Sequence, residues 1–163
     1  MHPNNNLSHI IMDFRITEIE ALTGPKARIY SVIMEGEDKS LLEQFFDENN
    51  AYAKDLKKVI YKIHVMAHDT GCRRSFFKEG EGAWGDGMVA LDSTGRLRLY
   101  GIYFHDAVIL FGSGGYKPSN VKAYEDHPPL NEKAQQMRVI AKEIYRRITD
   151  GELKVNKDGT LEE

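Results

Sequence analysis

The sequence contains a single cysteine, Cys72, among its 163 residues. One cysteine excludes an intramolecular disulfide and any zinc site built from several thiolates, and it is typical of proteins in a reducing compartment. No apolar run approaches the roughly 20 residues that a membrane-spanning helix needs. The opening stretch MHPNNNLSHIIMDF lacks a positively charged region followed by an apolar one, so we expect no signal peptide. These absences predict a cytoplasmic protein.

The sequence also lacks an excess of positive charge. It has 22 Lys and Arg residues and 25 Asp and Glu residues, which gives a net charge of −3. This balance argues against a protein that coats nucleic acid through a uniformly basic surface, although it allows a local basic patch. A hydrophobic fraction of 41% and a charged fraction of 29% describe an ordinary globular chain. We therefore expect one domain over residues 1–163, with a loose polar tail at 1–10.

The next segments predict a β-hairpin followed by two helices. β-Branched residues dominate segments 14–22 and 27–36, and the Thr-Gly-Pro-Lys turn signal at 23–26 separates them. Ser40 and Glu43 form the pattern of a capping box, which predicts a helix start. That helix should end at Asn49-Asn50, and a second one-sided helix should run from Tyr52 to a C-terminal glycine, Gly71. Two helices with a short joint form an αα-hairpin.

The second half predicts a three-strand meander and a long helix. Segments 88–91, 97–104 and 107–111 read as strands, and the unalternating AVILF at 107–111 is typical of a strand buried on both faces. Pro128-Pro129 predicts a helix start, and Asp150-Gly151 its end. The charged tail at 149–163 contains a possible hairpin around 156–159. The fold class is therefore α+β: a mostly antiparallel curved sheet with the αα-hairpin and the C-terminal helix packed on it.

The stretch GSGGYKPS at 112–119 resembles a phosphate-binding loop without satisfying its pattern. Tyr116 occupies the position of the last glycine, and Pro118 occupies that of the Ser or Thr magnesium ligand. A bulky residue and a proline without an N–H group argue against a tight nest of amides around a phosphate. A glycine-rich exit from a strand is the simpler interpretation, which leaves the role of Lys117 open.

The order of elements, together with the stretches GDGMVAL, GRLRLYGIYF and HDAVILFGSGGYKP and a following helix that contains Ala134, resembles the RelE/ParE toxin superfamily, and its HigB-like branch most. The resemblance covers residues 28–148, the expected RelE-like core. Members of this family are endoribonucleases that use no metal or other cofactor and are neutralised by an antitoxin from an adjacent gene. The resemblance thus implies RNA or the ribosome as a partner, together with an antitoxin protein.

The resemblance also implies a set of site residues. The chemistry is attack of an RNA 2′-OH on the adjacent phosphate, which needs positive groups around the phosphorane and a proton donor and acceptor. The matching positions imply Arg98 and Lys117 as the catalytic cations, with Tyr116 and His105 as the accompanying Tyr and His. The RNA-binding candidates are Arg73, Arg74, Lys78, Arg96 and Tyr100. If the last two meander strands pair through the His105-Asp106 turn, Arg98 should lie near residues 112–114.

Several of these residues have a second interpretation. His105 and Asp106 form either an acid–base pair or a tight turn whose geometry they satisfy. His64 and His68, four residues apart on one helix, form either a metal pair or an ordinary surface pair. The family has a cation at the end of the first meander strand, where this chain has Leu91-Asp92. A second hypothesis is therefore a catalytically degenerate RelE-like fold that acts as a protein-binding module.

Overall fold

The computed structural model describes residues 13–78, 87–92, 95–120 and 127–163. The predicted tail at 1–10 lies outside these residues. The two N-terminal strands, β1 (Phe14–Glu18) and β2 (Arg28–Met34), form the expected antiparallel hairpin. The meander consists of β4 (Met88–Leu91), β5 (Leu97–His105) and β6 (Val108–Tyr116), and the two-residue strand β3 (Phe77–Lys78) is added at its edge.

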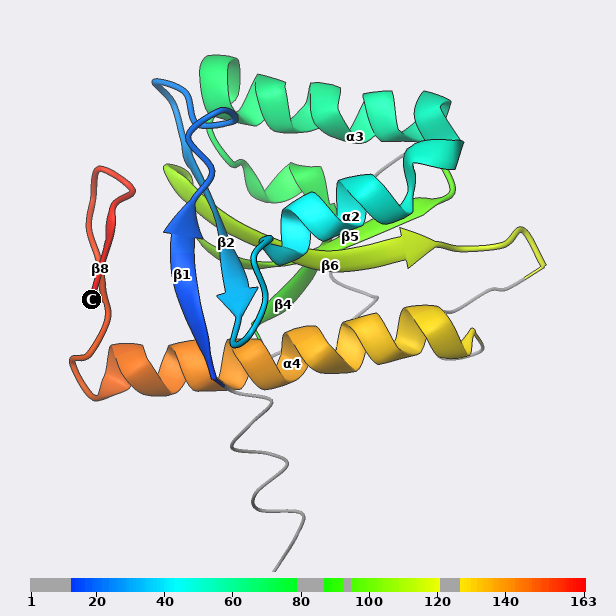
Figure 1. Cartoon of the computed structure of the whole chain (residues 1–163). Coiled ribbons are helices and arrows are strands. Elements are labelled where there is room, and N and C mark those ends of the chain that lie inside the picture. The colour runs from blue at the N-terminus through cyan, green and yellow to red at the C-terminus, as the bar shows by residue number, and fades with distance from the viewer. Residues whose placement is uncertain (1–12, 79–86, 93–94, 121–126) are drawn as a thin grey trace, which may run out of the picture.

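These strands form one six-stranded sheet in the order β1-β2-β6-β5-β4-β3 (Figure 1). Four of its neighbouring pairs are antiparallel, whereas β2 and β6 run parallel over three residue pairs that begin with Arg28 opposite Val108. The α+β class is confirmed, and the sheet is mixed. A parallel pair requires a long crossover connection, which the helices between β2 and the meander provide.

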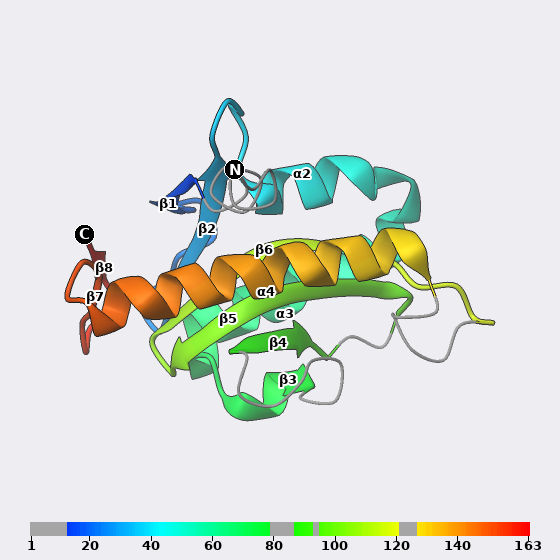
Figure 2. The ribbon, with the colours of Figure 1, turned by 90° about the horizontal axis from the view of Figure 1, so that it is seen from below.

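Helices cover both faces of the sheet (Figures 1 and 2). α2 (Leu41–Glu48) and α3 (Ala53–Val65) form the predicted αα-hairpin and pack on one face, and α4 (Pro128–Thr149) packs on the other. Within β6, Val108 and Leu110 face α4, whereas Ile109 and Phe111 face α2 and α3. The prediction that this strand is buried on both faces is therefore confirmed. None of the helices in the described ranges has the length and hydropathy needed to cross a membrane.

Local signals for the helix ends are confirmed. The Glu43 N–H donates to Ser40 Oγ at 3.1 Å, and the Ser40 N–H donates to Glu43 Oε1 at 3.2 Å, which completes the capping box. α3 continues into a π-helical turn (Met66–Thr70), and Gly71 ends it with a φ of 81°. Glycine adopts this left-handed conformation without a steric penalty.

The C-terminal tail is attached to the sheet. β7 (Lys154–Val155) and β8 (Leu161–Glu162) form the predicted hairpin. Leu153 is buried in the α4-side core, and the Leu161 N–H donates to the Tyr30 hydroxyl at 3.1 Å. The tail therefore contributes to the packed structure as well as carrying charge.

Candidate functional site

The strongest candidate site is a groove of about 380 Å³ at the C-terminal end of β6. Its floor is the end of the strand, its first wall is the end of α2 with the following turn, and its second wall is the start of α4. The lining residues are Gly114, Gly115, Tyr116, Glu48, Asn49, Tyr52, His127, Pro129, Leu130 and Lys133. Because β2 pairs with β6 only as far as Leu110, α2 and α4 flank the end of β6 in place of a strand.

A β-bulge in β6 decides which side chains face α4. Leu99 pairs with Gly114 and Gly101 with Phe111, so Gly112 and Ser113 together lie opposite Tyr100. Such an extra residue reverses the alternation of the bulged strand. A Cβ on Gly112 would collide with the Met137 sulfur of α4. The Ser113 hydroxyl also faces α4, since it donates to Gln136 Oε1 at 2.8 Å.

Beyond the bulge, three cationic residues share one face of the sheet. Arg98 lies opposite Gly115, whose missing Cβ would contact Leu130 of α4. The Lys117 N–H donates to the Arg96 carbonyl oxygen at 2.8 Å, so the ladder continues past the strand end. Every second side chain of a strand points to the same face, so Arg96 lies on the face of Arg98 and Lys117 on the face of Gly115. Both are on the side that faces α4. Without the bulge, Lys117 would face the opposite side.

The backbone of this stretch does not form a phosphate-binding loop. Residues 112–116 belong to β6, and none of their glycines has a positive φ. Their role is close packing: Gly112 leaves room for Met137, and a Cβ on Gly114 would collide with the Arg98 carbonyl oxygen. The interpretation as a glycine-rich strand exit is therefore confirmed.

The cationic groups beside the groove favour an anion. The Arg98 guanidinium is half-buried, and Nη1 donates to the carbonyl oxygens of Gly95 and Leu97 at 3.2 Å each. The first turn of α4 contains no acidic residue, so its positive helix end is not neutralised from within the helix. Lys133 forms an ion pair with Glu48 at 3.2 Å, which joins the two walls.

Tyr116 contributes an aromatic ring on the other side of the strand. Its ring stacks on that of Tyr52, with centroids 4.3 Å apart and an angle of 14° between the planes. Tyr52 belongs to the short 3₁₀ turn (Asn50–Tyr52) that joins α2 to α3. Both rings line the groove together with Lys133, so its surface combines an aromatic pair with a cation.

His105 lies at the opposite end of the sheet. It lies seven positions after Arg98 in β5, which corresponds to roughly 23 Å of extended strand. Its Nδ1 accepts from the Ala107 N–H at 3.1 Å, and its Nε2 lies 2.9 Å from the Asn156 carbonyl oxygen. Nδ1 is thus the accepting nitrogen of the ring, and Nε2 is the one that donates to the Asn156 carbonyl oxygen. His105 is too far from Arg98 and Lys117 to act together with them. Its hydrogen bonds are those of a residue that stabilises a tight turn.

The predicted RNA-binding residues are also divided. Tyr100 alternates onto the same face as Arg98, but α4 covers it there, so it is fully buried and its ring is not accessible to a base. Arg73 and Arg74 are exposed and lie near the β5–β6 turn, where the Cys72 N–H donates to the Asp106 carbonyl oxygen at 2.6 Å. The Arg74 guanidinium lies 5.3 Å from the centre of the Tyr103 ring.

Lys78 lies on the edge strand β3, where it forms an ion pair with Asp92 at 3.5 Å. Of the predicted residues, Tyr116 lines the groove, and Arg96, Arg98 and Lys117 lie beside it at the end of the β5–β6 ladder. The sequence analysis missed Tyr52 and His127, which also line the groove. His127 is the N-cap residue of α4, immediately before the Pro128-Pro129 signal, but its position beside Gly115 depends on a contact between distant segments.

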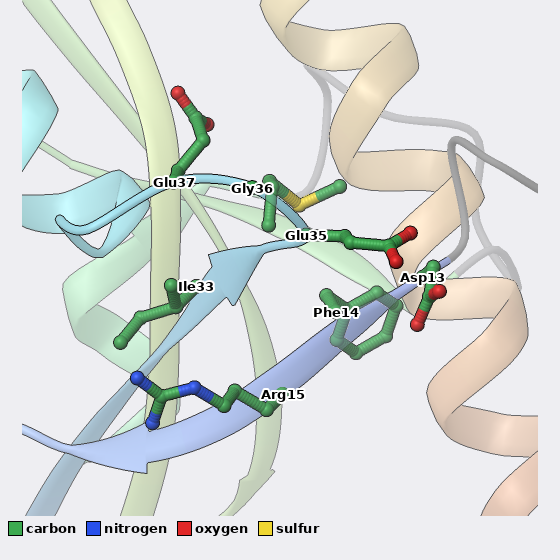
Figure 3. A pocket seen from close by; sticks show the side chains of 8 residues that line it. Asp13, Phe14, Arg15, Ile33, Glu35, Gly36 and Glu37 are labelled. Carbon is green, nitrogen blue, oxygen red and sulfur yellow. The ribbon is translucent and has the colours of Figure 1, made fainter.

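A second hollow lies beside the first residues of β1 and the end of β2 (Figure 3). Asp13 and Glu35 lie close together on one side of it, whereas Arg15 and Glu37 point elsewhere. Across the described ranges, no group of three His, Cys, Asp or Glu residues could hold a metal ion. The His64 ring of α3 stacks on the His68 ring of the following π-helical turn, with centroids 4.3 Å apart.

Comparisons with known proteins identify no relative of this chain. No family model matches the chain, and no curated protein or solved structure matches it. The groove and its flanking cations are therefore the basis for a functional assignment.

Proposed function

We propose that this protein is a RelE/HigB-like endoribonuclease that binds RNA at the groove beyond β6. The observation that carries this proposal is the shared face of Arg98 and Lys117 beside the first turn of α4. Arginine and lysine at the end of a sheet, together with an accessible groove, suit a phosphodiester ligand. The order of elements from β2 to α4 supports the RelE-like interpretation, and the proposal places the protein in the cytoplasm with an antitoxin partner.

Each cation has a distinct role in this proposal. The planar Arg98 guanidinium binds two phosphate oxygens at once and remains charged as the phosphorane develops. Lys117 adds a compact charge from the neighbouring strand. Arg96, on the exposed end of the same face, contacts a flanking phosphate. Lys133 lines the groove as well, where it forms an ion pair with Glu48.

The reaction needs only the RNA and the protein side chains. The 2′-oxygen forms a bond to phosphorus while the bond to the 5′-oxygen breaks, which leaves a 2′,3′-cyclic phosphate and a 5′-hydroxyl. A base accepts the 2′-OH proton, and an acid protonates the leaving oxygen. His127 replaces His105 as the imidazole candidate, because among the described histidines it alone lines the groove. Tyr116 is the second candidate for proton transfer.

The test is cleavage of a labelled RNA by purified protein, with the wild type compared with Arg98→Ala and Arg98→Lys. We expect Arg98→Ala to reduce the cleavage rate at least tenfold, because one charge-assisted phosphate contact contributes more than about 1.4 kcal/mol. Arg15→Ala is the matched control, since Arg15 is an exposed strand arginine at the far edge of the sheet. Equal cleavage by the wild type and Arg98→Ala, with both proteins folded by circular dichroism, would contradict the proposal.

A separate surface favours the alternative, a protein-binding module. Tyr61 and Ile60 on α3 are 67% and 39% exposed, and Lys57, Lys58 and Lys62 surround Tyr61. An exposed aromatic ring among lysines fits an acidic protein segment. If the wild type cleaves no RNA but forms a stoichiometric complex with the product of an adjacent gene, and Tyr61→Ala weakens that complex, this alternative replaces the enzyme.

A further inference from the structure

The stacked rings of Tyr52 and Tyr116 form an aromatic platform in the groove, and the protein covers this platform only in part. Tyr116 is half-buried and packs against the core between the sheet and α3. Tyr52 covers Tyr116 with a nearly parallel ring, yet Tyr52 itself remains 39% exposed. One aromatic ring is thus supported by the core, and the second presents aromatic surface to the groove.

The turn that carries Tyr52 is held in place. The Tyr52 N–H donates to the Asn49 carbonyl oxygen at 2.9 Å. The buried Asn49 side chain in turn donates from Nδ2 to the Phe45 carbonyl oxygen at 2.8 Å. These bonds fix the turn to the end of α2, so the Tyr52 ring is positioned before a ligand arrives. A rigid aromatic side chain loses little conformational entropy when a planar group stacks on it.

The platform in the groove and the cations lie at the same end of the β5–β6 ladder. Tyr116 pairs with Leu97 in the ladder, and the neighbouring pair is Gly115 with Arg98. The two adjacent pairs present their side chains to opposite faces of the sheet, so a single strand that passes over the end of β6 would place a phosphate at Arg98 and Lys117 and a base on Tyr52. Stacking on aromatic side chains is the common mode of single-strand recognition.

We propose that Tyr52 is a binding residue for an unpaired RNA base, which extends the Tyr116–Tyr52 stack by one ring. This inference rests on the proposed function and adds to it that the ligand is single-stranded, since a paired base has both of its faces covered by neighbours. The stacking discriminates weakly among bases, because every base has an aromatic face.

The experiment measures the affinity of a fluorescent ten-nucleotide RNA and of the corresponding duplex, with a non-cleavable 2′-O-methyl backbone. The proteins are the wild type, Tyr52→Ala, Tyr52→Trp and Arg98→Ala. We expect Tyr52→Ala to weaken single-strand binding about tenfold, Tyr52→Trp to retain it, and duplex binding to change little. Tyr145→Ala is the matched control, because Tyr145 has the same exposed fraction of 39% but lies outside the groove.

A second readout detects the stack directly. A 2-aminopurine base in the RNA should lose fluorescence when it stacks on the wild type and on Tyr52→Trp, and it should recover fluorescence on Tyr52→Ala. If Tyr52→Ala binds RNA and quenches its fluorescence like the wild type while Arg98→Ala loses affinity, the proposed stacking on Tyr52 is wrong. The proposal of an RNA site at Arg98 is then retained. If the wild type binds no single-stranded RNA, the proposed function and the platform both fail.

Discussion

Arg98 lies directly across the β5–β6 ladder from Gly115, and both residues face α4. The expected position of Arg98 near residues 112–114 takes His105 and Asp106 as the turn, whereas the turn is Asp106-Ala107 and His105 pairs with Val108. The irregularity between Tyr103 and His105 leaves an extra residue on β5 and the one between Leu99 and Gly101 an extra residue on β6, so the two offset each other along the ladder. The bulge opposite Tyr100 brings Arg98 and Lys117 to one face, and two glycine substitutions test this register.

We expect Gly115→Ala to fold normally and Gly114→Ala to destabilise the protein. A Cβ on Gly115 would lie 3.6 Å from Leu130 Cδ1, an ordinary van der Waals distance. A Cβ on Gly114 would collide with the Arg98 backbone, and such overpacking typically costs about 1–3 kcal/mol. Urea unfolding of both variants measures the difference. Equal stability of the two variants would mean that the register is wrong.

His105→Ala should affect stability and leave RNA cleavage unchanged. The imidazole joins the β5–β6 turn to the C-terminal hairpin through Ala107 and Asn156. Loss of two partly buried hydrogen bonds should lower the free energy of unfolding by about 1–2 kcal/mol. The control is His64→Ala, since His64 is exposed on α3. A rate loss per folded molecule comparable to that of Arg98→Ala would return His105 to the active site.

Acid should remove a contribution of Glu143 to stability. Hydrogen bonds from Arg146 and from Arg147 outweigh the opposing effect of burial and lower the pKa of Glu143 to about 2. An unfolded glutamate titrates near 4.3. A lowered folded-state pKa contributes stability that is complete above the unfolded pKa and is lost as the pH falls toward about 2.

The comparison of wild type with Glu143→Gln measures this contribution. The wild type should be more stable above about pH 5, and the two proteins should converge as the pH falls toward 2. Glu132→Gln on the same helix is the control, since Glu132 is exposed near the other end of α4. A stability difference that stays constant from pH 6 to 2 would contradict the assigned role of the carboxylate.

Cys72 should report global unfolding through its reactivity. Burial, and secondarily the charge of Asp106, raises the pKa of the Cys72 thiol to about 12. The thiolate that reacts with disulfide reagents is therefore scarce at pH 8, and the sulfur is also inaccessible. We expect no reaction of the native protein with an aromatic disulfide reagent and one thiol per chain in urea. Rapid labelling of the native protein at pH 8 would show that this part of the core opens.

The sequence by itself determined the elements whose signals are local. The Ser40 and Glu43 capping box started α2, the Pro128-Pro129 pair started α4, and the apolar run AVILF identified a strand buried on both faces. These signals depend on hydrogen bonds within one turn or on the periodicity of one segment, so neighbouring residues are sufficient to produce them.

Only the tertiary structure decided which residues meet at the groove. The parallel pairing of β2 with β6, the bulge at Gly112-Ser113 and the stack of Tyr52 on Tyr116 all join segments that are distant in the sequence. A one-residue change of register exchanges the two faces of a strand, and it is the packing against α4 and α2 that selects the register. For this physical reason, Lys117 shares a face with Arg98, and the covering helix α4 buries Tyr100 on that same face.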